Sequence, residues 1–318
     1  MFATKPQALL PERPNPLDVV IDTIGSVIVG KERAIRLALA CLLARGHLLI
    51  QDLPGMGKTT LAKAFAHVLG LRYQRIQFTS DLLPADVLGA AIYERQQGTF
   101  VFHPGPIFSQ LILADEINRA TPKTQSALLE AMEENQVTIE GETRPLPQPF
   151  FVIATQNPIT QVGTFPLPES QLDRFLMRIE LGYPDAQAER ALLQGQDRRE
   201  LLGKLPVCLS PVQVQDLQAA VPSVHVAPAL LDYLQAVLAF SRQSNLFRGG
   251  LSPRAGLALL RAARAWALLS RRDHVLPEDV QAVLPTVIGH RLHPGDEHLE
   301  KAPADLVAQL IAAIEVPA

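Results

Sequence analysis

A glycine-rich loop stands between a short apolar segment and a helix-like pattern, with the sequence DLPGMGKTT at residues 52–60. Glycine lets the backbone approach a phosphate closely, so the N–H groups of Gly55 to Thr59 can surround one. Lys58 would reach the β- and γ-phosphates of a nucleotide, and the Thr59 hydroxyl would bind Mg²⁺. The strict phosphate-loop pattern begins with glycine, whereas this sequence has Asp52 there. A turn that binds nothing would not need a Lys-Thr pair. We therefore predict an ATP site formed by Pro54, Gly55, Met56, Gly57, Lys58, Thr59 and Thr60.

Two carboxylates follow an apolar run at residues 111–114. Asp115 and Glu116 come directly after the sequence LILA. The carboxyl ends of the strands form the ligand crevice of an open parallel sheet, so we expect this pair beside the phosphate loop. Asp115 would hold Mg²⁺, directly or through water, and Glu116 would orient and deprotonate the attacking water. The alternative is a solvated pair that caps the next helix; the phosphate loop upstream favours the first interpretation.

The elements that would carry these residues alternate along the first part of the chain. Helical patterns at residues 59–69 and 122–134 separate short apolar runs, and the second begins at a proline and places Leu128 and Met132 on one face. Alternating strands and helices predict a doubly wound α/β domain over residues 1–183. Apolar runs typical of buried parallel strands lie at residues 47–50, 75–78, 111–114, 150–154 and 177–181.

Two hairpins are expected to interrupt this alternation. Residues 92–102 centre on Gln-Gly and carry alternating phenylalanines, and residues 137–146 centre on Glu-Gly. Phe100, Phe102 and Phe108 could instead be core residues.

After Tyr183 the composition changes to Ala- and Leu-rich patterns without a convincing strand. Most of the predicted helices begin at a proline, which suits the first helical position. We expect an all-helical second domain over residues 184–318. Its predicted helices cover residues 186–194, 228–241, 253–269, 277–288 and 303–314.

The composition limits the classes of protein. A chain of 318 residues suggests about two domains, and 47% hydrophobic with 19% charged residues allows a sizeable core and excludes wholesale disorder. Lysine and arginine total 29 against 32 aspartate and glutamate. The resulting net charge of −3 excludes an overall basic nucleic-acid binder, though not a local basic groove.

Signals for export, membrane insertion or zinc binding are missing from the sequence. Residues 1–16 hold no apolar signal-peptide core, and polar residues interrupt the apolar stretch 34–50 before the ~20 residues that a membrane span needs. Cys41 and Cys208 lie far apart in apolar surroundings, which fits a reducing cytoplasm. The histidines show no paired zinc spacing, since His290 and His293 suit a helix end better. We expect a cytoplasmic protein without direct membrane insertion.

Long segments of the chain resemble the MoxR branch of the AAA+ ATPases. They are ADEINRA, LLEAMEENQVTIEGE, FFVIATQNP, FPLPESQLDRFLMRI, and GLSPRAGLALLRAARAWAL followed by LPEDV. The resemblance runs from about residue 29 to residue 290 and is far more specific than the phosphate loop alone. It implies an αβα core with a parallel sheet and two inserted β-hairpins, followed by a helical lid domain.

The resemblance also implies roles for two polar residues of the core. Asn157 matches the first sensor, which hydrogen-bonds the γ-phosphate or the attacking water; its other interpretation is a turn-forming residue before proline. Arg174 matches the arginine finger that reaches the γ-phosphate of the neighbouring subunit, where a guanidinium can be worth ~10³–10⁵ in rate. A surface ion pair is the alternative for Arg174, and Arg119 and Arg178 are the other candidates for the finger.

Further matches concern the lid and the adenine. Arg254 matches the second sensor: with Ser252 as N-cap and Pro253 in the first turn, it would start a helix and face the nucleotide across the domain interface. Val29 and Gly30 match the backbone that lines the adenine, although such a loop is also common without that role.

The function that the resemblance implies is Mg²⁺-dependent ATP hydrolysis in a homo-oligomeric ring, expected to be a hexamer. Hydrolysis would move the lid against the core and so remodel, assemble or activate a client protein, often alongside a partner with a von Willebrand factor A domain. One alternative is a DNA-linked motor, but the net charge and the mixed charges of the hairpin tips argue against a nucleic-acid partner. Another is a nucleotide-dependent scaffold with little turnover, which would not need Glu116 or Arg174.

Overall fold

A five-stranded parallel sheet lies at the centre of the computed structural model, which describes residues 15–96, 98–157, 165–195 and 198–316. The strand order is β2-β5-β8-β1-β9, and every paired neighbour is parallel. The five predicted strands are confirmed, with small shifts at their ends. Their bounds are β1 (Leu48–Gln51), β2 (Tyr73–Gln77), β5 (Leu111–Asp115), β8 (Phe151–Gln156) and β9 (Met177–Ile179).

The inner strands are apolar throughout because both faces of the sheet are covered. Leu48 and Ile50 pack into one hydrophobic cluster, whereas Leu49 between them packs into another. Successive side chains of a strand point to opposite faces, so a strand covered on both sides needs a continuous apolar run. One cluster includes α1 (Pro16–Gly25), α2 (Glu32–Leu43) and α3 (Lys58–Val68); the other includes α4 (Pro84–Leu88) and α5 (Pro122–Glu134).

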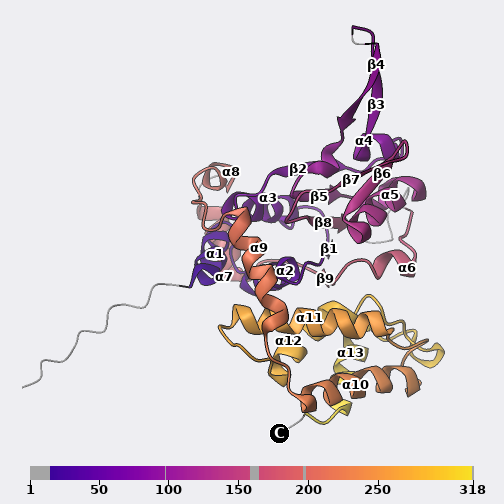
Figure 1. Cartoon of the computed structure of the whole chain (residues 1–318). Coiled ribbons are helices and arrows are strands. Elements are labelled where there is room, and N and C mark those ends of the chain that lie inside the picture. The colour runs from indigo at the N-terminus through magenta and orange to yellow at the C-terminus, as the bar shows by residue number, and fades with distance from the viewer. Residues whose placement is uncertain (1–14, 97, 158–164, 196–197, 317–318) are drawn as a thin grey trace, which may run out of the picture.

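Both predicted hairpins are present. The first consists of β3 (Gly89–Glu94) and β4 (Thr99–Pro104) and stands out from the body of the molecule (Figure 1). The second consists of β6 (Gln136–Ile139) and β7 (Glu142–Pro145) and directly follows α5. Short 3₁₀ turns, η1 (Pro106–Phe108) and η2 (Ile117–Arg119), flank β5.

The chain after β9 is helical in its described residues, apart from isolated β-bridges. α7 (Ala186–Gln194), α8 (Arg198–Leu202) and α9 (Pro211–Ala220) lie along the α/β layer, and α10 (Pro228–Gln243), α11 (Pro253–Leu269), α12 (Pro277–Ile288) and α13 (Pro303–Ala313) form a separate helical layer (Figure 1). The remaining short elements are α6 (Glu169–Leu172), η3 (Val221–Ser223) and η4 (Asp296–His298). The division after Tyr183 into two domains stays a prediction. No helix among the described residues is long and apolar enough to cross a membrane.

The helical layer docks through α11. This helix packs on α2, and its buried Ala258, Ala262 and Ala265 belong to the same hydrophobic cluster as α2. Small side chains let two helices approach closely, so the alanine-rich sequence of α11 serves packing. The docking brings the first turn of α11 to the end of α5, where Arg254 meets Glu133.

Candidate active site

The phosphate loop between β1 and α3 has an open backbone. Gly55 and Gly57 have φ angles of 87° and 88°, a left-handed conformation that favours glycine. No heavy atom lies within 4 Å of the place where a Cβ would stand at either residue. The loop therefore has the left-handed glycine conformation, and an uncovered backbone at both glycines, that suit the approach of a phosphate before the first turn of α3.

Lys58 folds back over this loop. Its Nζ donates to the backbone oxygens of Asp52 at 2.6 Å and Leu53 at 3.2 Å. Burial lowers the pKa of the ammonium, and the nearby carboxylates of Asp52, Asp115 and Glu116 oppose that shift. Because a phosphate oxygen is a stronger acceptor than a carbonyl, the arrangement favours transfer of Lys58 to a bound nucleotide.

Asp52 anchors the start of the loop. Its Oδ2 accepts hydrogen bonds from the backbone N–H groups of Leu181 and Gly182, both at 2.7 Å, and its Oδ1 accepts from Leu53 N at 2.8 Å. The side chain thus ties the phosphate loop to the chain that follows β9. A glycine, which the strict pattern has at this position, could not make these bonds.

Asp115 is held by two side chains from the neighbouring strands. Its Oδ1 accepts from Thr155 Oγ1 at 2.6 Å, and its Oδ2 accepts from Arg75 Nε at 3.1 Å and Nη2 at 2.6 Å. Thr155 lies on β8 and Arg75 on β2, on either side of β5 in the sheet. The carboxylate is thereby fixed at the carboxyl end of β5; its role as a Mg²⁺ ligand stays a prediction.

Glu116 has a φ angle of 57°, in the left-handed region, and its backbone N donates to Thr155 Oγ1 at 2.8 Å. Asn157 Nδ2 donates to its Oε1 at 2.8 Å. Its Oε2 accepts from Gln77 Nε2 at 3.0 Å and pairs with Arg119 Nε at 3.0 Å. The structure therefore brings the predicted base Glu116 and the predicted first sensor Asn157 into direct contact.

These groups share one cavity of about 300 Å³. It is lined by Pro54, Gly55, Gly57, Lys58, Thr59, Thr60, Asp115, Glu116 and Asn157. Met56, which was also predicted to bind nucleotide, packs its side chain against the main hydrophobic cluster, so only its backbone N–H group stays a candidate for the phosphate.

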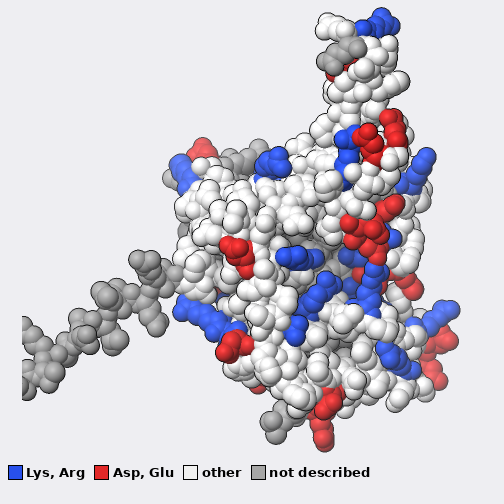
Figure 2. Space-filling model, viewed as in Figure 1, with Lys and Arg blue, Asp and Glu red and all other residues white. Residues whose placement is uncertain are grey.

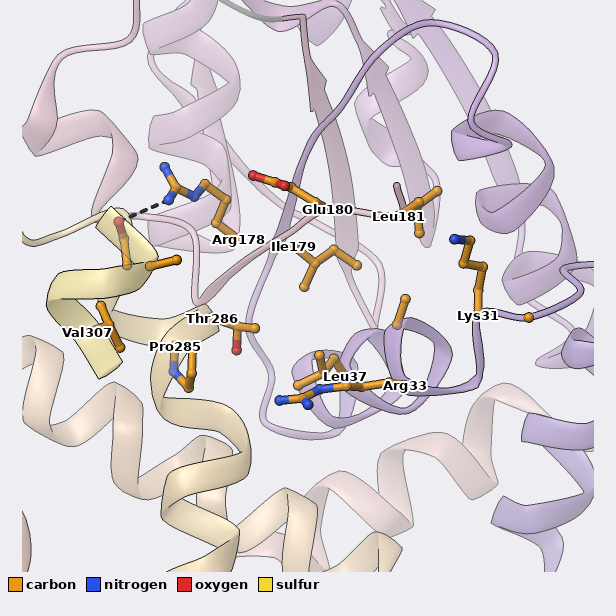
Figure 3. Close-up of a pocket in the computed structure, with 14 residues that line it drawn as sticks. Lys31, Arg33, Leu37, Arg178, Ile179, Glu180, Leu181, Pro285, Thr286 and Val307 are labelled. Atoms are coloured by element: carbon orange, nitrogen blue, oxygen red, sulfur yellow. Dashed lines mark hydrogen bonds between the residues drawn. The ribbon is translucent and has the colours of Figure 1, made fainter. Parts of the chain in front are cut away.

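A second cavity, of about 450 Å³, lies between α2, β9 and the helices α12 and α13 (Figure 3). Gly30 and Lys31 line it, and a Cβ at Gly30 would stand 2.8 Å from the Cβ of Ala188. Lys31 Nζ donates to the backbone oxygen of Tyr183 at 2.6 Å. The loop before α2 thus packs against the chain after β9, while Val29 does not line this cavity.

The three candidate arginine fingers and the predicted second sensor, Arg254, lie in three different places. Arg119 pairs with Glu116 in its own chain. Arg178 is engaged internally: its Nη2 donates to Gly289 O at 3.0 Å, and burial lowers its pKa. Arg174 and Arg254 lie together, at a cavity that includes no residue of the phosphate loop.

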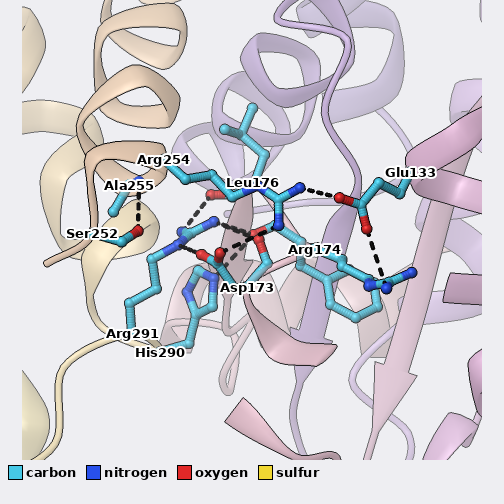
Figure 4. A network of polar contacts seen from close by, with 10 residues as sticks. Glu133, Asp173, Arg174, Leu176, Ser252, Arg254, Ala255, His290 and Arg291 are labelled. Atoms are coloured by element: carbon cyan, nitrogen blue, oxygen red, sulfur yellow. Dashed lines mark hydrogen bonds and ion pairs between the residues drawn. The ribbon is translucent and has the colours of Figure 1, made fainter. Parts of the chain in front are cut away.

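Arg254, which was expected to face the nucleotide across the domain interface, does not line the phosphate-loop cavity of its own chain. Ser252 does cap α11, since its side chain accepts from Ala255 N, and Pro253 lies in the first turn. Arg254, however, pairs with Glu133 and, at 3.7 Å, with Asp173 (Figure 4). The docking of α11 on α2 sets this position, and the sequence of the helix start alone does not reveal it.

Comparisons with known proteins agree with this fold. Residues 47–177 match the family model "ATPase family associated with various cellular activities (AAA)", and residues 239–310 match the AAA lid domain. The uncharacterized protein YeaC of Bacillus subtilis is 44% identical over 95% of both chains, and chaperone MoxR1 of Mycobacterium tuberculosis is 41% identical over 87% of this chain and 75% of its own. Protein MoxR of Paracoccus denitrificans is 36% identical over 93% and 94%. The chain belongs to the MoxR family of AAA+ ATPases. A crystal structure from Cytophaga hutchinsonii, of a protein provisionally assigned as an ATPase, superposes with a TM-score of 0.88 at 36% identity over 96% of both chains.

Several residues of this MoxR-family site escaped the sequence motifs. Arg75, Gln77 and Thr155 bind the side chains of Asp115 or Glu116, and Asp52 accepts from Lys58 through its backbone oxygen. Arg75 and Gln77 are two residues apart on β2, so their side chains share one face of the sheet, near the carboxyl end where Asp115 lies. This spacing was the available sequence signal for them.

Proposed function

We propose that the protein hydrolyses ATP in a Mg²⁺-dependent reaction. The observation that carries the proposal is the single cavity shared by the phosphate loop, Asp115, Glu116 and Asn157. Lys58 and the loop N–H groups would bind the phosphates. Glu116 would orient the attacking water and accept its proton, with Asn157 holding the carboxylate in place.

The residues at this cavity fit Mg²⁺. Mg²⁺ is usually bound by one or two protein oxygens together with substrate phosphates and water, and the Thr59 hydroxyl and the Asp115 carboxylate line the cavity. No cluster of three His, Cys, Asp or Glu residues that could hold another metal occurs among the described residues. When bound, Mg²⁺ would neutralise charge on the phosphate oxygens. Arg75 is the counter-ion of Asp115.

We further propose that the active site is completed by a neighbouring subunit in a ring, most simply a hexamer. Arg174 and Arg254 are side chains of phosphate-binding type that do not reach the phosphate-loop cavity of their own chain. A guanidinium supplied by a neighbour would offset charge in the transition state. Arg174 is the preferred finger, because Arg119 pairs with Glu116 in cis and Arg178 is bound to Gly289.

The adenine is proposed to lie near the loop at Val29 and Gly30, which packs on the chain after Tyr183. Nucleotide there would sit between the core of residues 1–183 and the lid of residues 184–318. Turnover could then change the angle between the two layers.

The ATPase is proposed to act on a client protein in the cytoplasm. The printed name of the Mycobacterium tuberculosis relative, chaperone MoxR1, supports that class of function. The β3–β4 hairpin offers a contact surface: Tyr93 and Phe100 pack ring to ring at 5.3 Å, yet Phe100 is 70% exposed. Phe102 instead packs against Phe108 at the base of the hairpin. A partner with a von Willebrand factor A domain belongs to the same proposal, and a nucleic-acid partner does not.

The proposal is tested by ATP binding and turnover of the Glu116→Gln variant. We expect the variant to bind Mg·ATP as the parent does and to lose turnover, because the amide cannot accept the proton of the water. A Lys58→Ala variant should lose binding as well. Absence of turnover in the parent with every partner tested would make the protein a nucleotide-dependent scaffold instead.

A further inference from the structure

Two arginines from different layers of the molecule meet on one carboxylate. Arg174 lies just before β9 and Arg254 in the first turn of α11, whereas Glu133 lies in the last turn of α5. Glu133 Oε2 lies 3.2 Å from Arg174 Nη2, and its Oε1 accepts from Arg254 Nη2 (Figure 4). The hydrogen bond to Glu133 is the main reason why the pKa of Arg254 is raised.

The surroundings of this pair carry an excess of positive charge. A cavity of about 220 Å³ lies beside it, and the acidic residues that line it are Glu133 and Asp173. Its basic side chains are Arg45, Arg174, Arg254, Arg261 and Arg291. Charged side chains of both signs also gather where the two layers meet, on the face seen in Figure 2. We call this cavity and its five arginines the arginine basin. Its excess of positive charge suits an anion with several oxygens.

The arginines of the basin differ in how firmly they are held. Arg291 is buried, with 6% of its side chain exposed, and binds Asp173 Oδ1 at 2.6 Å as well as the backbone oxygens of Phe175 and Leu176. Arg254 is 54% exposed and Arg174 28% exposed, and the bonds described for their guanidinium groups end on Glu133 or Asp173. Arg291 therefore fixes the backbone before β9, while the other two can exchange partners.

We propose that Glu133 acts as a latch. In the free subunit its carboxylate pairs with Arg174 and Arg254, and the terminal phosphate of a neighbour's nucleotide displaces it. A carboxylate and a phosphate offer a guanidinium similar pairs of oxygens, so Glu133 takes the place that the phosphate would take. This inference rests on the proposed sharing of the active site between subunits. Glu133 is a positioning residue in it, since it acts through the arginines and does not contact the nucleotide.

The exchange involves the side chain of Glu133 and leaves the backbone of α5 in place. The residue before it, Met132, is anchored through its backbone oxygen to His47 Nε2 at 3.1 Å. His47 Nδ1 in turn accepts from Val152 N on β8 at 3.1 Å. With the helix end fixed to the sheet, releasing the arginines costs the partly exposed ion pairs that they make with Glu133 and that Arg254 makes with Asp173.

The test is ATP-dependent self-association of the full-length chain, measured by sedimentation velocity. All variants carry Glu116→Gln, so that ATP is retained during the run. Replacing Glu133 by Gln removes the charge of the latch and keeps its size. We expect the protein concentration at half-assembly to fall by roughly two- to fivefold, the range for losing partly exposed ion pairs. Glu134→Gln, the adjacent carboxylate of the same helix, should leave it unchanged.

A second comparison separates the latch from the shared site. Removing both guanidinium groups, in Arg174→Ala with Arg254→Ala, should weaken assembly and abolish any effect of Glu133→Gln. If the double arginine variant assembles as its parent does, the shared site and the latch both fail. The other informative outcome is that the double arginine variant assembles poorly, whereas Glu133→Gln or Glu133→Ala, in a chain with both arginines, weakens assembly or leaves it unchanged. In that case the shared site stands and the latch is wrong.

Discussion

Thr155 joins the two acidic residues of the site. Its hydroxyl is buried, donates to Asp115 Oδ1 and accepts from the backbone N of Glu116. The substitution Thr155→Val keeps the shape of the side chain and removes both bonds. It leaves a backbone N–H without an acceptor and gives Asp115 one donor fewer.

The expected cost follows from those two bonds. A hydrogen bond to a charged group contributes about 1.5–3 kcal/mol and a neutral one about 0.5–1.5 kcal/mol, so their loss should destabilise the fold by about 2–4.5 kcal/mol. Glu116 sits at a φ angle of 57°, and Thr155 is the acceptor for its N–H group. We therefore expect turnover to fall by about tenfold or more, because misplacing a catalytic base raises the barrier. ATP affinity, set by the phosphate loop, should change little.

Urea unfolding and steady-state ATP hydrolysis measure the two effects. Thr155→Ser should restore most of both, since it returns the hydroxyl. Thr138→Val is the matched control, because that hydroxyl bonds Thr143 in an exposed hairpin. Unfolding and turnover of Thr155→Val equal to those of the parent would refute the assigned role of the threonine.

Three further outcomes are expected. Asp52→Gly, which restores the strict phosphate-loop pattern, should weaken ATP binding by about tenfold in equilibrium dialysis, because it releases the loop from the N–H groups at Leu181 and Gly182; equal or tighter binding would contradict this. Arg75→Met should lower the Mg²⁺ concentration for half-maximal ATP binding by roughly two- to fivefold, since a partly exposed cation then no longer competes for Asp115; an unchanged Mg²⁺ titration would count against it. Burial lowers the pKa of His47 to about 4, below its ordinary value near 6.5, so the neutral imidazole favours the folded state above pH 6.5 and that contribution is lost as the pH falls toward 4. The loss amounts to about 3 kcal/mol, and His47→Gln should show a correspondingly flatter dependence of unfolding free energy on pH than the parent.

The sequence was sufficient for the sheet, and it named the residues that line the phosphate-loop cavity. Buried parallel strands have continuous apolar runs, so strands such as β5 and β8 were located directly. Asp115 and Glu116 follow from the end of such a strand, and the phosphate loop follows from its glycines. The helices α1, α2 and α9 were not singled out, although α1 and α9 each begin with a capping side chain, Asn15 or Ser210, and a proline in the first turn.

What the sequence could not reveal depends on contacts between distant segments. Asp52 acquires its role from Leu181 and Gly182, and Thr155 from a strand register that places it beside Asp115. The place of Arg254 depends on how α11 docks on α2, which no local pattern encodes. Motifs identified the chemical groups, whereas packing between layers decides which of them can meet.

The most direct test of a shared active site is to mix two variants that are each impaired alone. Glu116→Gln subunits keep an intact Arg174 but cannot hydrolyse their own ATP, and Arg174→Ala subunits have an intact base but offer no finger to a neighbour. In an equal mixture a site is complete when an Arg174→Ala subunit receives the arginine of a Glu116→Gln neighbour, so activity should recover to about one quarter of the parent's. A mixture no more active than the sum of its parts, or an Arg174→Ala variant as active as the parent, would contradict the account.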